Sequence, residues 1–149
     1  MRWIIVYLLH REFYIQQSKL ILKFIFISLF GTCLYYLQSE EWIVPDAAKS
    51  LENPTDKEDQ DDLEYGQTLF SQHCKSCHGK KGLGDGTAAK NLETQLPDFT
   101  LDKFQSQTDG SLFHKISTGR NEMPEFVRKM PDDEDRWLIV NYLRTLSEK

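Results

Sequence analysis

Two cysteines and a histidine lie within five residues of one another near the middle of the chain, in the order Cys74-Lys75-Ser76-Cys77-His78. Thiols three positions apart on one helical turn can form thioethers with the two vinyl groups of a haem, and C-x-x-C-H is the attachment signature of haem c. The adjacent imidazole then lies close to the iron as a proximal ligand. The sequence therefore predicts one covalent haem c with its iron, held by thioethers from Cys74 and Cys77 and by His78 as an axial ligand.

Two other interpretations of a paired-cysteine motif fit the chain less well. A zinc site needs four ligands, usually in two pairs, but only one such pair is present, and the other histidines of this region are His73 and His114. A thioredoxin-like dithiol follows a strand and precedes a helix, whereas here a helical pattern precedes the motif and a glycine-rich loop, 79–86, follows it. The third cysteine, Cys33, lies in an apolar segment, so a disulfide framework is not expected.

A methionine is the best candidate for the second axial ligand. The thioether of Met123 is neutral and soft, so it would favour ferrous iron and raise the reduction potential, and Pro124 stiffens the loop that presents it. Met130 also precedes a proline, but it lies at the start of the last predicted helix, where an apolar residue is expected to pack. Among the histidines, His73 is too close to the motif to reach the other haem face, and His114 is expected at a helix surface or the haem edge.

Three helices are expected to position these residues. The first spans about 61–74, with acidic residues in its first turn and apolar residues on one face. The second spans about 109–118 and ends at Gly119, a residue type typical of helix C-termini, and the third spans about 131–147 with an apolar stripe. No strand alternation is visible, so the domain is predicted to be all-α with long loops. Such a short domain is expected to need a bound group in its core.

The order and spacing of these motifs, from Leu63 to Leu146, resemble a class I cytochrome c domain. The matching pieces are Gly66-x-x-Leu69-Phe70, Cys74-x-x-Cys77-His78-Gly79, Gly82-x-Gly84-Asp85-Gly86, Pro97-x-Phe99, Gln107-Thr108-Asp109-Gly110, Met123-Pro124-x-Phe126 and Trp137-x-x-Val140-x-Tyr142-Leu143-Arg144-Thr145-Leu146. The chain is especially similar to bacterial single-haem cytochromes with a Trp-x-Val-Pro lead-in, here Trp42-Ile43-Val44-Pro45.

This resemblance implies a cytochrome c fold, in which the first and last helices cross and a covalent haem fills the core. Gly66 would permit the close approach of the helices, with Phe70 and Tyr142 at the crossing. Such proteins often read Gly-Asp-Gly-Pro, and the proline region supplies a backbone carbonyl to the proximal histidine; Thr87 stands in that place here, which leaves the acceptor open. The resemblance also implies an electron carrier rather than an enzyme, with a reductase and an oxidase or dehydrogenase as redox partners.

An apolar N-terminal segment, residues 1–37, is predicted to form a signal or anchor helix. Its run 20–37 carries one charge, Lys23, and is just long enough to span a bilayer. Basic residues precede the main run and acidic residues follow it, so the domain is expected on the periplasmic side of the cytoplasmic membrane. Because no A-x-A cleavage site follows, a retained transmembrane anchor is favoured. A cleaved signal peptide and a lipoprotein modified at Cys33 are the alternatives.

The remaining chain divides into an acidic linker, 38–61, and a cytochrome domain, 62–149. The formal net charge of −5 argues against a nucleic-acid partner, which would require a basic face. The predicted function is one-electron transfer in a periplasmic or membrane-attached respiratory chain. Two alternatives are an electron-entry haem subunit of a larger oxidoreductase and a haem domain with an open iron that senses or reduces a small ligand.

Overall fold

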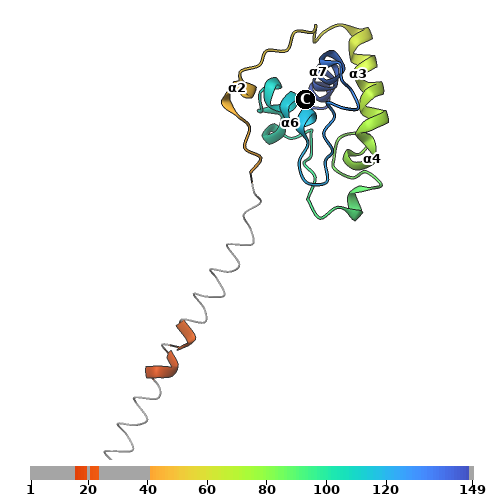
Figure 1. Ribbon diagram of the computed structural model, residues 1–149. Coiled ribbons are helices and arrows are strands. Elements are labelled where there is room, and N and C mark those ends of the chain that lie inside the picture. Colours follow the sequence, from red (N-terminus) through yellow and green to blue (C-terminus); the bar gives the residue numbers. More distant parts are fainter. Residues whose placement is uncertain (1–15, 20, 24–40, 148–149) are drawn as a thin grey trace, which may run out of the picture. The chain divides into compact units, whose positions relative to one another are not determined.

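A computed structural model describes residues 16–19, 21–23 and 41–147 (Figure 1). The chain divides into two compact units, Met1–Trp42 and Ile43–Lys149. In the first unit the described residues before position 24 are helical; the rest of the predicted membrane segment, with Cys33, lies outside the described residues. Among the residues that are described, no helix is both long enough and apolar enough to cross a membrane.

The second unit is built from helices and loops. Its elements are α2 (Asp46–Lys49), α3 (Gln60–His73), α4 (Lys75–His78), the 3₁₀ turn η1 (Ala89–Asn91), α5 (Asp102–Gln105), α6 (Asp109–Thr118) and α7 (Asp133–Thr145). No β-strand occurs within 41–147, where extended pairing is limited to an isolated bridge. The predicted all-α class is therefore confirmed, and the three expected helices correspond to α3, α6 and α7.

Local sequence sets the ends of these three helices. Each begins after a residue whose side chain accepts a hydrogen bond from a backbone amide of the first turn, a role that Asp59, Thr108 and Asp132 perform. The last turn of α6 ends at Gly119, whose φ of 61° suits a residue without a Cβ. The three helices were predicted from other local signals, namely acidic residues in the first turn, an apolar face and Gly119, and the capping residues were not identified from the sequence.

Helices α3 and α7 pack against each other (Figure 1). A Cβ at Gly66 would lie 2.3 Å from the carbonyl oxygen of Leu138, so only glycine allows the two backbones to approach this closely. Beside this contact, the rings of Phe70 and Tyr142 pack with their centroids 5.2 Å apart. The expected crossing of the first and last helices is thus present, with the glycine and both aromatic residues at the contact.

Residues 43–59, most of the segment predicted to be an acidic linker, belong to the compact unit that contains α3–α7. Val44 and Ala48 are buried, and α2 lies against α6, where a Cβ at Gly110 would come within 2.2 Å of the Ala48 carbonyl oxygen. Residues 43–59 therefore pack on the domain, whereas the sequence predicted a linker outside it. The composition of this segment is polar, but two small apolar side chains and a glycine on the facing helix suffice to attach it.

Polar side chains complete this attachment on the face of α7. The side-chain amide of Asn53 donates to the side-chain oxygen of Asn141 at 2.7 Å, and the amide nitrogen of Asn141 donates to the Thr55 hydroxyl at 2.9 Å. Asn141 is fully buried, and a buried amide that lacks hydrogen-bond partners destabilises the fold. The segment before α3 is therefore part of the folded domain.

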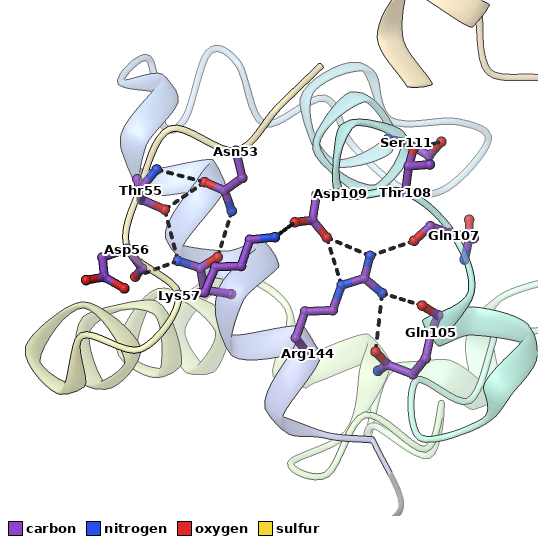
Figure 2. Close-up of polar contacts among 11 residues, drawn as sticks. Asn53, Thr55, Asp56, Lys57, Gln105, Gln107, Thr108, Asp109, Ser111 and Arg144 are labelled. Carbon is purple, nitrogen blue, oxygen red and sulfur yellow. Dashed lines mark hydrogen bonds and ion pairs between the residues drawn. The ribbon is translucent and has the colours of Figure 1, made fainter. Parts of the chain in front are cut away.

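A second polar cluster joins the same segment to the start of α6. Lys57 forms an ion pair with Asp109 at 2.6 Å, and the Arg144 guanidinium binds the other oxygen of that carboxylate at 2.7 Å (Figure 2). Arg144 also donates to the backbone carbonyls of Gln105 and Gln107. Burial opposes ionisation of Asp109, but the hydrogen bonds from Lys57 and Arg144 outweigh it and lower its pKa. The start of α6 is thereby fixed to α7.

Candidate functional site

The cysteine–histidine motif forms a single helical turn at the end of α3. The amide of Cys74 donates to the Phe70 carbonyl at 2.8 Å, and the amide of His78 donates to the Cys74 carbonyl at 2.9 Å. Both Cys74 and Cys77 are half-buried and free of a disulfide. The two thiols and the imidazole are therefore presented together by one rigid turn, as covalent attachment of haem c requires.

The glycine-rich loop folds back onto this turn. The amide of Gly84 donates to the His78 carbonyl at 3.0 Å, and the amide of Gly86 donates to the Cys77 carbonyl at 3.1 Å. A Cβ at Gly86 would lie 2.3 Å from the Ser76 carbonyl oxygen, so a larger residue would push the loop away. The loop thus satisfies the carbonyl groups that end the helical turn and holds the motif in place.

The ring of His78 lies in an aromatic environment. It stacks on Phe99 with the ring centroids 4.6 Å apart, and Phe99 stacks in turn on Phe104 at 4.3 Å. Burial lowers the pKa of His78 to about 4, which keeps the imidazole in the neutral form that ligates metals. Its Nδ1 atom is buried and makes no hydrogen bond to any described residue, so the backbone acceptor expected near Thr87 is not engaged.

The thiol of Cys74 is also held neutral. Burial, with a smaller contribution from the nearby Cys77, raises its pKa to about 12. The Cys74 side chain packs against the main apolar cluster of the domain, as does that of Met123. Two thiols and a neutral imidazole beside an aromatic core fit haem c, because the residues supply both the covalent attachment points and an apolar environment for the ring.

Met123 lies in a tight turn that follows α6. Its amide and carbonyl both pair with the backbone of Arg120 at 2.9 Å, and Asn121 within the turn has a φ of 52°. The next aromatic residue, Phe126, is buried, and its amide donates to the Ile116 carbonyl at 3.2 Å. Backbone contacts on both sides therefore fix the segment that carries the candidate ligand.

The alternative ligands occupy different environments. Met130 is only 2% exposed within the apolar cluster, and its carbonyl accepts a hydrogen bond from the buried Arg136. His73 packs edge-to-face on Phe126 at 6.1 Å, and His114 lies half-buried on α6. Within the described part of the chain, there is no group of three or more His, Cys, Asp or Glu side chains that could together hold a metal ion.

Two residues of the site carry contacts that the sequence did not predict. Phe99 belongs to a recognised motif, but its stacking on His78 depends on the path of a long loop. Glu122 accepts hydrogen bonds from the Glu93 amide at 3.0 Å and the Thr94 hydroxyl at 2.6 Å. The hydrogen bond from Thr94, helped by those from backbone amides, lowers the pKa of Glu122. These partners of Glu122 lie 28 and 29 residues away in an irregular segment, so the sequence around Glu122 does not indicate them.

Comparison with known proteins agrees with this geometry. The family model described as cytochrome c oxidase, cbb3-type, subunit III matches residues 61–143, more than half of the chain. A cytochrome c6 of Pyropia tenera is 30% identical over 88 residues, covering 59% of this chain and 96% of the relative. A cytochrome c6 of Parathermosynechococcus lividus is 27% identical over 73 residues, covering 49% of this chain and 78% of the relative.

A solved structure shares the fold. A chain of the reducing HAO-like protein complex of Kuenenia stuttgartiensis superposes with a TM-score of 0.58 at 25% sequence identity. The match covers 76% of this chain but only 54% of that chain, so this protein spans about half the length of its structural relative. The family match includes the helical turn at Cys74–His78 and the loop that carries Met123.

Proposed function

This chain belongs to the class I c-type cytochromes, and from that membership we propose that it transfers single electrons through one haem c whose iron is ligated by His78 and Met123. As a family member the chain is a haem electron carrier. The proposal adds the attachment through Cys74 and Cys77, the two axial ligands, and a place in a periplasmic or membrane-attached respiratory chain.

One observation carries the ligand proposal: the attachment turn and the turn after α6 both pack against the same apolar cluster. Cys74, from the attachment turn, and Met123, from the turn after α6, are the two half-buried sulfur residues that line this cluster. Met130 is instead enclosed by core side chains, and the hydrogen bond from Arg136 holds its backbone. Met123 is therefore the methionine better placed to give its sulfur to a bound group.

The residues around the site suit electron transfer without substrate chemistry. Haem c, when bound, supplies a one-electron couple. Met123 would contribute a neutral thioether, which favours the ferrous state and raises the reduction potential. Phe99 covers the imidazole of His78 with apolar surface and is itself backed by Phe104, which lowers the local dielectric and disfavours the additional charge of the oxidised state. No proton-transferring side chain is needed for this role.

A spectroelectrochemical titration of the haem-loaded protein tests the ligand proposal. We expect one reversible one-electron couple, because the chain carries one attachment motif, and a sulfur-to-iron charge-transfer absorption in the oxidised state. An oxidised spectrum without that absorption would favour bis-histidine ligation or an open iron. An open iron would support the alternative role of sensing or reducing a small ligand.

A second candidate function is that of an electron-entry haem subunit in a larger oxidoreductase. Two findings favour it: the matching family model is described as an oxidase subunit, and the structural relative comes from a protein complex. Purification at native expression levels distinguishes the two functions. A free carrier is expected to elute alone, whereas a subunit is expected to co-purify with its partners in fixed ratio.

We also propose that the domain is exported and stays attached to the membrane through residues 1–37. Protein made from the full chain is expected to remain with membranes after a high-salt wash, because salt screens charge interactions but not apolar insertion. Replacement of residues 1–39 by a cleavable signal sequence is expected to release it. A shortened soluble periplasmic protein from the full chain would instead show a cleaved signal peptide, and fatty-acid labelling of Cys33 would show a lipoprotein.

A further inference from the structure

The carboxylate of Glu122 joins two loops that are far apart in sequence. One oxygen accepts the amide of Glu93 at 3.0 Å, and the other accepts the hydroxyl of Thr94 at 2.6 Å. Both groups belong to the irregular segment that follows η1, whereas Glu122 belongs to the turn after α6. Hydrogen bonds to an ionised carboxylate are stronger than those between neutral groups, so the pair forms a bridge, here called the 93–122 tether.

The turn that carries Glu122 is itself closed by backbone contacts. Arg120 and Met123 exchange both of their backbone hydrogen bonds at 2.9 Å, and Asn121 takes a positive φ of 52° between them. Gly119 lies so close to this turn that a Cβ there would come within 2.4 Å of the Met123 carbonyl oxygen. The turn is thus compact, so a movement of Glu122 also moves the backbone of the neighbouring Met123.

We propose that Glu122 is a positioning residue for Met123, whose tether to Glu93 and Thr94 holds the ligand turn closed and slows release of the sulfur from the iron. This inference rests on the proposed ligation by Met123. Without the tether, the turn keeps its internal hydrogen bonds but loses its side-chain connection to the 93–94 segment. The turn can then open as a unit, and the sulfur leaves the iron more often.

Glu125 provides a matched control. It is the first carboxylate after Met123, two residues further along the chain, and it carries the same charge as Glu122. Its ion pair, however, is with Arg128, three residues further along the same segment, at 2.6 Å. Removal of Glu125 therefore changes the charge near the ligand without cutting a connection to the 93–94 segment.

The experiment measures how fast imidazole displaces the methionine from the oxidised haem protein, followed by loss of the sulfur-to-iron absorption. At saturating imidazole this rate reports opening of the ligand turn. Glu122→Ala is expected to accelerate it about tenfold, since two charge-assisted hydrogen bonds are lost. Glu125→Ala is expected to change it by less than about twofold. Glu122→Gln, which can still accept from the Glu93 amide and donate to the Thr94 hydroxyl, is expected to restore most of the slow rate.

Thr94→Val tests the tether from its other end, because it removes one hydrogen bond without changing any charge. We expect an acceleration between those of wild type and Glu122→Ala. Equal rates for wild type, Glu122→Ala and Thr94→Val, with the absorption intact, would overturn the tether and leave Met123 ligation standing. Equal acceleration by Glu122→Ala and Glu125→Ala would also overturn it, because charge alone would then explain the effect. Absence of the absorption in wild-type protein would overturn the ligation and the tether together.

Discussion

Replacement of both Cys74 and Cys77 by alanine is expected to abolish stable haem-loaded protein, the largest effect of any change considered for this chain. The two thiols on one helical turn are the proposed points of covalent attachment, and no other cysteine lies in the domain. Wild-type protein, produced with export and haem c maturation, should keep its colour in the pellet after acid–acetone extraction. Each single variant should retain at most one thioether, with a corresponding shift of the reduced haem spectrum.

The same variants should also lose folding stability, because haem would be part of the core. Anything that binds only the folded chain adds its binding free energy to stability, and a domain of this size with long loops has little apolar core of its own. Loss of the cooperative thermal transition, followed by circular dichroism, is the expected result for the double variant. A cooperative transition like that of wild type would show that the protein core alone supports the fold.

Ser76→Ala is the control for this experiment. Ser76 lies on the same turn between the two cysteines, and its side chain is exposed. Its hydroxyl lies 3.9 Å from the Cys77 sulfur, too far for more than a weak interaction. The variant should therefore keep both thioethers and the wild-type melting behaviour. If acid–acetone extraction removed the colour from the wild-type protein, the proposed attachment through Cys74 and Cys77 would be wrong.

The sequence predicted the three main helices because their signals are local. Acidic residues gather in the first turns of α3 and α7, apolar residues recur along one face of each, and Gly119 ends α6 in a conformation that favours glycine. The contact of α3 with α7 followed from a resemblance that placed Gly66 at the crossing. The signals of the single helices involve residues within one or two turns, so the neighbouring sequence is enough to identify them, whereas the crossing joins Gly66 to the distant Leu138 and followed from the resemblance alone.

Contacts between distant segments were not predictable in the same way. The attachment of residues 43–59 depends on Gly110 of α6 and Asn141 of α7, which meet that segment only after the domain has folded. Its polar, proline-containing sequence resembles that of a free linker. Glu122 shows the same limit within the candidate site, because its partners lie in an irregular loop. Polar side chains that join loops have no periodicity, so composition and spacing do not identify them.

Met123→Ala is expected to remove the sulfur-to-iron absorption of the oxidised protein and to lower the reduction potential by on the order of 0.1 V or more, within the roughly 0.8 V range over which axial ligands set haem potentials. The thioether favours the ferrous state, and its loss leaves the iron to water or another oxygen or nitrogen ligand, which favours the ferric state. A potentiometric titration with absorption spectra at each potential measures both changes in one experiment.

Met130→Ala is the matched control for Met123→Ala, since it removes the same side chain from a position seven residues further along the chain. Met130 is buried in the apolar cluster, and truncation of a buried methionine typically costs about 2–5 kcal/mol of stability. We therefore expect a lower melting temperature with the absorption preserved and the potential little changed. The opposite pattern, with the absorption lost in Met130→Ala and kept in Met123→Ala, would assign the ligand to Met130. The buried sulfur would then have to leave the core for the iron, and the turn at 120–123 would have no ligand to hold.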